Sequence, residues 1–407
     1  MKSLFIKLIL VALIGSAHHV FGQNNRAQYN SLLKDSYFEV NFGYINYPFG
    51  SSSLEDGYTV ESVEVPHASP RIVLYGHNFN KYLSAQISYT RPIFWVRYNN
   101  IDGPNGYKDS SNHPVFMNIG GLTAKGTLPI GNRFSIYGEA GLAIITRTGF
   151  HEKDDSERPD IVTDANYGTL VLGAGLNFHI SPKWALKISS IYSPANERAR
   201  QPYTVHYGFG FSYTMRELSE EDLIEKAKSK YIFPENIIQI GYSTNEFGYG
   251  VNDFFSEGAV PVFWGGNAHV VYGFTALYQR NIFHGTKTFS LDIGSSFSYW
   301  KSQEFNDEFI TLAIFPVFKF VLLHTKPFDL YFNYSLAGPA YISGLNIDGR
   351  ETGPQFTFQD FMGTGFFIGK ERKLNIDLRI AHFSNGNVFP ENEGVKIPLT
   401  FSLGYTF

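Results

Sequence analysis

The sequence predicts an all-β protein built of two tandem eight-stranded antiparallel transmembrane β-barrels joined by a short helical linker. Three observations predict this fold: period-two alternation of apolar residues, an aromatic-rich composition, and one charged helical segment near the middle. Aromatic residues make up 17% of the 407 residues, with 38 Phe and 26 Tyr, yet the mean hydropathy is slightly negative. This composition does not suit a bundle of membrane helices, but it suits strands with one aromatic and one polar face.

The C-terminal segment shows the alternation most clearly. Its apolar residues Ile397, Leu399, Phe401, Leu403, Tyr405 and Phe407 alternate with Pro398, Thr400, Ser402, Gly404 and Thr406. Successive side chains of a strand point to opposite faces, so we expect the apolar set to face lipid and the other to line a lumen. The chain stops on Phe407, as outer-membrane barrels commonly do, which predicts the barrel-assembly machinery and outer-membrane lipids as partners.

Segments with this alternation fall into two groups of eight. The first lies near 36–46, 69–79, 82–97, 113–128, 133–148, 166–179, 183–194 and 203–215, and the second near 236–246, 266–282, 286–301, 308–323, 327–343, 355–369, 373–384 and 396–407. Eight strands close a small barrel filled by its own side chains. A single barrel of sixteen strands is the alternative. Charged residues such as Glu139 and Lys187 fall opposite the apolar faces, where a lumen can hold them in a hydrogen-bonded network.

The segment 216–231 separates the two groups and predicts a helix. Ser219 is a candidate N-cap with Asp222 three residues on, and acidic residues precede lysines as the helix dipole prefers. The segment is too charged to lie in a bilayer, so we interpret it as a periplasmic linker between two closed barrels. Short turns at 129–132 and 181–183 are expected on the periplasmic side. The long polar stretches 49–67, 98–112, 149–165 and 247–265 are expected as outer loops.

The N-terminus is typical of a cleaved signal peptide. Lys2 and Lys7 flank an apolar run over 8–15 that is too short to span a bilayer. We therefore predict cleavage after Gly22 and an integral protein of the bacterial outer membrane. The predicted organisation is a signal peptide at 1–22, a barrel at 36–215, a linker at 216–233 and a second barrel at 234–407.

Composition excludes several kinds of chemistry. The chain has no cysteine, so neither a disulfide framework nor a thiolate nucleophile is available. The formal net charge is −4 and no basic cluster offsets it, which argues against nucleic acid as a partner. Carboxylates at 152–157, Asp253 and Glu257 could bind a divalent cation, but solvated loops are the favoured interpretation. We predict no metal and no cofactor.

One segment breaks the alternation of apolar and polar faces. Leu374, Ile376, Leu378 and Ile380 occupy the predicted lipid-facing positions, and continuing the count places His382 and Ser384 on the same face. Polar residues on a lipid face call for a functional hypothesis. A histidine can take the proton of a serine hydroxyl during attack on an acyl carbon if a carboxylate fixes the imidazole. The alternative is that the strand has ended, because 385–387 has the composition of a turn.

This segment resembles the lipid A 3-O-deacylases, the PagL family of eight-stranded outer-membrane barrels. The resemblance rests on His382-Phe383-Ser384-Asn385-Gly386, on Pro390, Asn392 and Gly394, on Phe358-Gln359-Asp360 before Gly363 and Gly365, and on Gly338-Pro339-Ala340-Tyr341. It implies a membrane-surface serine esterase that removes an ester-linked acyl chain from lipid A of lipopolysaccharide. In that reading His382 is the general base and Ser384 the nucleophile. Backbone groups near Asn385 and Gly386 form the oxyanion hole, and Asn392 supports them.

The acid of the expected triad is where the sequence departs from the family. The family carries a glutamate two residues after the glycine that Gly394 resembles, and here that position is Lys396. Glu393 shares the parity of Val395 and Ile397, so we predict that it points outward and orients His382, with Glu391 as the alternative acid. Asp360, Asp377 and Arg379 are expected in the lumen.

The alternative function is a non-catalytic tandem barrel for anchoring, adhesion or minor permeation. The N-terminal group resembles small OmpA-like barrels, through its alternation and glycine-rich strands such as 173–176, and shows no catalytic set. A homodimer is left open.

Overall fold

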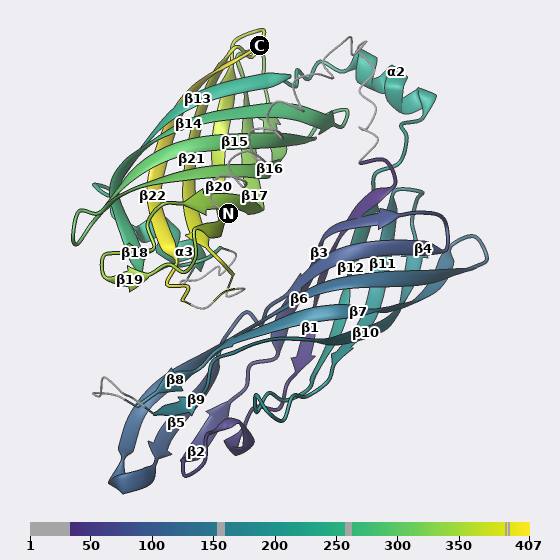
Figure 1. Ribbon diagram of the computed structural model, residues 1–407. Helices are drawn as coiled ribbons and strands as arrows, with labels where there is room; N and C mark the ends of the chain where they lie inside the picture. Colours follow the sequence, from purple (N-terminus) through teal and green to yellow (C-terminus); the bar gives the residue numbers. More distant parts are fainter. Residues whose placement is uncertain (1–32, 153–158, 257–262, 387–388, 390) are drawn as a thin grey trace.

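The computed structural model describes residues 33–152, 159–256, 263–386, 389 and 391–407. They form two closed barrels of eight antiparallel strands in tandem (Figure 1), which confirms the predicted fold class and excludes a single barrel of sixteen strands. The predicted signal peptide, most of the acidic loop at 152–157, Glu257 and Pro390 lie outside the described residues. Among the described helices, none is both long and apolar enough to cross a bilayer.

The first barrel closes through its first and last strands. Its strands are β1 (Ser36–Asn46), β3 (Ala68–Asn78), β4 (Leu83–Thr90), β6 (Lys108–Ile130), β7 (Phe134–Thr148), β10 (Ala165–His179), β11 (Trp184–Ser193) and β12 (Thr204–Thr214). Each strand pairs with its neighbour in this order, and β1 pairs with β12.

The second barrel repeats this arrangement. It consists of β13 (Asn236–Thr244), β14 (Ala268–His284), β15 (Phe289–Ser302), β16 (Glu308–His324), β17 (Phe328–Ile342), β20 (Phe356–Ile368), β21 (Leu374–Ser384) and β22 (Val395–Thr406). Here β13 pairs with β22, and the start of β22 also pairs in parallel with the start of β14 at the rim.

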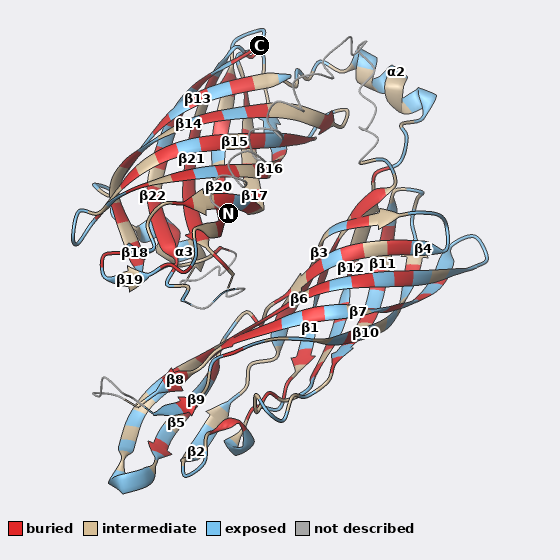
Figure 2. Ribbon diagram, in the orientation of Figure 1, coloured by how far each residue is buried: buried red, intermediate tan, exposed pale blue. Residues whose placement is uncertain are grey.

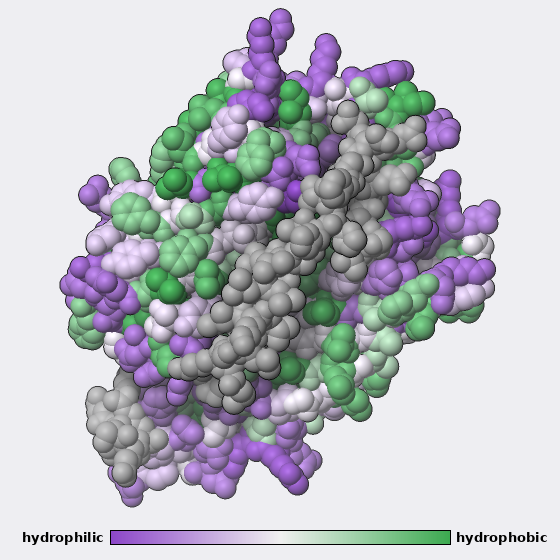
Figure 3. Space-filling model, turned by 45° about the horizontal axis from the view of Figure 1, so that its top comes forward, coloured by the Kyte–Doolittle hydropathy of each residue, from purple (hydrophilic) through white to green (hydrophobic). Residues whose placement is uncertain are grey.

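Burial alternates along the strands, as the bands in Figure 2 show. In β22, Thr400 and Ser402 are buried, whereas Phe401 and Leu403 are 49% and 52% exposed. Exposed aromatic and aliphatic residues recur around both barrels, including Phe42, Leu142, Ile188, Ile240 and Phe274. Figure 3 shows such hydrophobic patches on the surface. A water-soluble protein rarely exposes so much contiguous apolar surface, so the outer faces suit contact with lipid.

The lumen of the first barrel holds buried charged groups that neutralise one another. Glu39 accepts from Lys125 Nζ at 2.8 Å and also contacts the ammonium of Lys187. Glu139 accepts from Arg71 at 2.7 Å. Glu139 and Lys187 are thus in an internal network, as the sequence predicted, because a charged group away from water requires partners.

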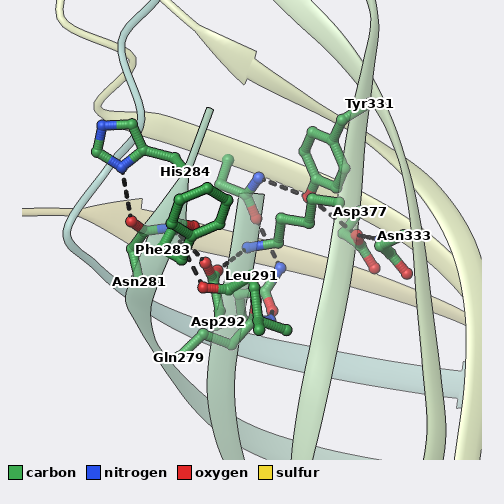
Figure 4. A network of polar contacts seen from close by, with 12 residues as sticks. Gln279, Asn281, Phe283, His284, Leu291, Asp292, Tyr331, Asn333 and Asp377 are labelled. Atoms are coloured by element: carbon green, nitrogen blue, oxygen red, sulfur yellow. Dashed lines mark hydrogen bonds and ion pairs between the residues drawn. The ribbon is translucent and has the colours of Figure 1, made fainter. Parts of the chain in front are cut away.

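The second barrel has a polar network in its interior (Figure 4). Asp377 accepts from the hydroxyl of Tyr331 at 2.9 Å and from Asn333 at 2.6 Å, and Arg379 donates to it at 2.6 Å. Asp377 and Arg379 are therefore lumen residues, as predicted. Further along, Asn281 bridges Asp292 and the ring of His284.

The outer segments of the first barrel contain more structure than the predicted loops. The long β6 extends beyond the barrel, and β5 (Val96–Asp102) and β2 (Thr59–Glu64) pair alongside it. Short elements complete this region: η1 (Ser51–Ser53), η2 (Pro104–Gly106), β8 (Phe150–His151) and β9 (Asp160–Val162). The prediction of plain loops was wrong here because Val96, Tyr98 and Ile101 bury their side chains in an apolar cluster.

The predicted linker helix is present as α2 (Glu220–Lys228). Ser219 and Asp222 form the expected capping box, and Asp222 also accepts from Lys183 Nζ at 2.8 Å. The second barrel adds α3 (Gly250–Ser256) in a stretch predicted as a loop, and the two-residue strands β18 (Asn346–Ile347) and β19 (Arg350–Glu351).

Candidate active site

His382 lies on the outer face of β21, near the end of the strand. Its neighbours Ala381 and Phe383 belong to the interior apolar cluster, in which the rings of Phe383 and Trp300 pack at 6.3 Å. Because side chains alternate along a strand, His382 faces the other way. The histidine is nevertheless only 2% exposed, so neighbouring residues cover it.

Ser384 is the last residue of β21 and shares the parity of His382. It is half-buried and pairs across the sheet with Phe358. Within the described residues no hydrogen bond joins the Ser384 hydroxyl to the imidazole. Catalytic hydrogen bonds are often long or misaligned before substrate binds, and the two side chains lie two residues apart on one face.

Asp360 lies directly opposite His382, in the β20–β21 register. Its carboxylate Oδ2 is 3.8 Å from His382 Nδ1, and its Oδ1 accepts from the backbone N–H of Ala337 at 2.5 Å. The prediction that Asp360 is a lumen residue was wrong. The next residue, Phe361, points into the barrel against Phe315, so Asp360 points outward.

A β-bulge in the last strand changes the predicted faces. Arg379 pairs with Thr400 but Ala381 pairs with Ile397, so one extra residue of β22 lies between them, at Pro398 and Leu399. Val395 and Ile397 consequently pack in the interior cluster, whereas the sequence predicted an outward face for Ile397. The same bulge places Lys396 opposite His382 on the outer side.

The two predicted acids are not brought to the imidazole. Glu393 precedes β22 and is exposed, and it accepts from Asn267 Nδ2 at 2.5 Å. Glu391 is also exposed and has a left-handed φ of 61°. Nδ1 of His382 has no hydrogen-bond partner in the described part of the chain. The parity argument for Glu393 failed because the residues that supplied the parity, Val395 and Ile397, point inward.

Lys396 binds an element that the sequence did not predict. Its Nζ lies 2.8 Å from Asp253 Oδ1 on α3. The preceding residue of α3, Asn252, is buried and donates to the carbonyl of Ile397 at 2.9 Å. These two contacts hold α3 against the start of β22.

Aromatic residues after α3 cover the histidine. Phe263 is 5% exposed and forms an apolar cluster with Met362 and Ile380. Its ring lies 6.4 Å from that of His382. Sequence reasoning missed these residues because 247–265 was interpreted as a polar loop, although aromatic residues at 254, 255, 263 and 264 were a signal for packing.

The turn after β21 is fixed by two asparagines. The backbone N–H of Asn385 donates to Asn392 Oδ1 at 2.7 Å, and Asn385 Nδ2 donates to the carbonyl of Glu391 at 3.2 Å. Asn385 is fully buried. These bonds suit the predicted supporting role of Asn392, and they occupy the Asn385 N–H in this state. Gly386 follows with a φ of 65°.

No group of three or more His, Asp or Glu side chains suited to a metal ion occurs among the residues that the structure describes.

Comparisons with known proteins match both halves of the chain. Residues 264–406 match the family model of lipid A 3-O-deacylase (PagL), and residues 9–214 match that of the outer membrane protein β-barrel domain. No curated protein matches the chain.

Similar solved structures each span one barrel. The outer membrane enzyme PagL has a TM-score of 0.30 and 13% identity, covering 42% of this chain and 99% of that one. The N-terminal β-barrel domain of Pseudomonas aeruginosa OprF has a TM-score of 0.25 and 16% identity, covering 44% and 98%. The attachment invasion locus protein Ail of Yersinia pestis has a TM-score of 0.26 and 16% identity, covering 44% and 99%.

The N-terminal match spans half of the chain, and the C-terminal match includes His382, Ser384 and Asp360. The chain therefore belongs to the integral outer-membrane β-barrel proteins, and residues 264–406 of its second barrel match the lipid A 3-O-deacylase (PagL) family model.

Proposed function

We propose that this protein is a serine esterase of the outer membrane that removes an ester-linked acyl chain from lipid A. The observation that carries the proposal is the pair of His382 and Ser384 on one face of β21, within the segment that matches the deacylase family. A polar pair on the apolar outer face of a membrane barrel has no structural reason to be there. A functional reason exists if the substrate reaches this pair from the lipid.

The proposed reaction proceeds in two steps. The Ser384 hydroxyl attacks the ester carbonyl, and its proton passes to His382. The bond from the carbonyl carbon to the alcohol oxygen then breaks, and the alcohol leaves on lipid A with that proton. Water, deprotonated by His382, attacks the acyl-serine ester and releases the fatty acid, which restores Ser384.

The position on the barrel also supports a lipid substrate. The acyl chains of lipid A lie beside the barrel in the outer leaflet, so an ester reaches the outer face of β21 without entering the lumen. The lumen beneath the site is closed by packed side chains such as Trp300 and Phe315, so the proposed approach is lateral, past the residues that cover His382.

The test compares lipid A from cells that express the wild type, Ser384→Ala or a matched control. Ser295 on the outer face of β15 is also half-buried, so Ser295→Ala is the control for loss of a hydroxyl on this barrel. Mass spectrometry should show lipid A lighter by one acyl chain with the wild type and the control, and full-length lipid A with Ser384→Ala. Deacylated lipid A from Ser384→Ala, in a properly assembled barrel, would reject the esterase.

A second candidate is a non-catalytic tandem barrel for anchoring, adhesion or minor permeation. Lys396 favours it, because a lysine paired with Asp253 stands where the family has its acid. This candidate predicts lipid A of unchanged mass whether the gene is present or deleted. The cleaved signal peptide, the domain bounds 36–215 and 234–407, the barrel-assembly machinery and a homodimer stay predictions.

A further inference from the structure

The imidazole of His382 has one nitrogen without a partner. Nδ1 is buried and makes no hydrogen bond within the described residues. A buried polar nitrogen normally finds a partner, because leaving it unsatisfied costs roughly 1–3 kcal/mol. The charged group that faces this nitrogen is Asp360 Oδ2, at 3.8 Å. The distance is about 0.6 Å beyond a hydrogen bond, which a small side-chain rotation closes.

Asp360 is itself held by the backbone. The register of β17 and β20 shifts between Ser335 and Gly338, and Ala337 in that bulge has a left-handed φ of 52°. This strained residue directs its N–H to Asp360 Oδ1 at 2.5 Å. The backbone of Ala337 thus fixes Oδ1 of Asp360, and Oδ2 faces the imidazole of His382.

The rival charged groups are engaged elsewhere. Glu393 is bonded to Asn267, and Lys396 is bonded to Asp253. Neither contact leaves the group directed at Nδ1.

We infer that Asp360 is the positioning residue that orients His382, in place of the family glutamate that Lys396 replaces here. The inference rests on the esterase function proposed above. After the side-chain rotation that closes this gap, Nδ1–H donates to Asp360 Oδ2, which fixes the tautomer and leaves Nε2 as the proton acceptor. Nε2 lies beside Gly394, where a Cβ would approach it to 3.1 Å. In this arrangement the acid lies on β20, the strand before the histidine, instead of on β22, the strand after it.

The first test measures turnover of the full chain in detergent micelles with purified lipid A as the probe. Asp360→Asn should lower kcat by about 10³–10⁴-fold with little change in KM, the scale seen when the acid of a triad becomes an amide. Asp360→Glu should restore part of kcat. Glu246→Gln removes an exposed carboxylate and serves as the charge control, and Glu393→Gln tests the rival acid.

The outcomes separate the two proposals. Loss of turnover in Ser384→Ala together with wild-type kcat in Asp360→Asn would overturn the role of Asp360 and leave the esterase standing. Loss in Glu393→Gln but not in Asp360→Asn would assign the acid to Glu393. Turnover in Ser384→Ala would reject the esterase itself.

A second measurement observes the proposed hydrogen bond directly and needs no turnover assay. With ¹⁵N-labelled histidine, the wild type should show a far-downfield Nδ1 proton, the signature of a hydrogen bond to a carboxylate, that is lost in His382→Gln. A second such signal, from His324 whose Nδ1 lies 2.5 Å from Asp329 Oδ1, should stay in both proteins. A wild-type spectrum without the His382 proton would overturn the inference.

Discussion

Lys396 of β22 and Asp253 of α3 form an ion pair, with Nζ 2.8 Å from Oδ1. The lysine side chain is 5% exposed and the aspartate side chain is 50% exposed. Lys396, which stands where the resemblance predicts a glutamate, therefore links β22 to the helix α3 beside the site.

Asp253→Asn should loosen α3, because the buried ammonium loses its carboxylate partner. We expect the protection of the α3 amides against hydrogen exchange to fall by about 1–2 kcal/mol, which is roughly tenfold in rate. Glu246→Gln, which removes an exposed carboxylate near this helix, should leave the exchange unchanged. Equal protection of α3 in Asp253→Asn and the wild type would show that the ion pair does not hold the helix.

Gly394→Ala should reduce turnover without preventing assembly. The residue has a φ of 66°, and an added Cβ would lie 3.1 Å from His382 Nε2 and 3.3 Å from Gly266 Cα. A displaced imidazole can cost about 10²-fold in rate. Gly369→Ala is the matched control, since Gly369 has a φ of 90° but open space around the added Cβ. Similar lipid A turnover in both variants would mean that backbone strain, and not contact with the imidazole, sets the effect.

Glu39→Gln should destabilise the first barrel strongly. Glu39 is 1% exposed and pairs with Lys125 and Lys187, so its neutralisation leaves two buried ammonium groups without a counter-charge. Breaking a buried pair in this way costs about 3–5 kcal/mol. Urea unfolding in lipid vesicles measures the loss, and Glu64→Gln on the exposed β2 is the control. A change below about 0.5 kcal/mol would contradict the role of this network.

Acid should weaken the docking of α2 on the first barrel. The side-chain hydrogen bond from Lys183 lowers the pKa of Asp222 below its ordinary value. A lowered folded-state pKa means that the contribution is present above about pH 4, the unfolded value, and is lost as the pH falls through the folded value. Since Asp222 is partly exposed, the effect stays below about 1 kcal/mol.

Hydrogen exchange of the α2 amides between pH 5 and pH 3, corrected for intrinsic rates, measures this loss. Lys183→Met should weaken the pH dependence and leave the part that comes from the bonds of Asp222 to Ser219. An undiminished dependence in Lys183→Met would show that the Lys183–Asp222 ion pair does not contribute to it.

The barrels could be predicted from sequence because the alternation within a single strand shows which residues face outward and which face inward. Alternation within a dozen residues places Phe401 and Leu403 outside and Ser402 inside, with no knowledge of the neighbouring strands. The capping box of Ser219 and Asp222 also depends only on neighbouring residues, and the structure confirms it.

The acid proposed for the site, Asp360, was not found from the final strand, because a bulge there changes which residues face outward. The bulge at Pro398 and Leu399 reverses the faces of Val395 and Ile397 relative to Phe401, so counting outward from the final strand misplaced Glu393. The bulge at Ala337 supplies the backbone N–H that binds the carboxylate of Asp360 on β20, a contact between strands that the sequence does not show. A proline inside the strand at 398 was the available signal. The position of α3 could not be predicted either, because it depends on a tertiary contact with the carbonyl of Ile397.

In each barrel the first strand pairs with the last: β1 pairs with β12, and β13 pairs with β22. Neither barrel contains a strand from the other half of the chain, so each closes with its own residues alone. A gene split within the segment after Met215 would then yield two separate proteins, and a fusion of two such genes would yield this one. Tandem architecture of this kind lets one barrel acquire a second without any change to its own strand pairing.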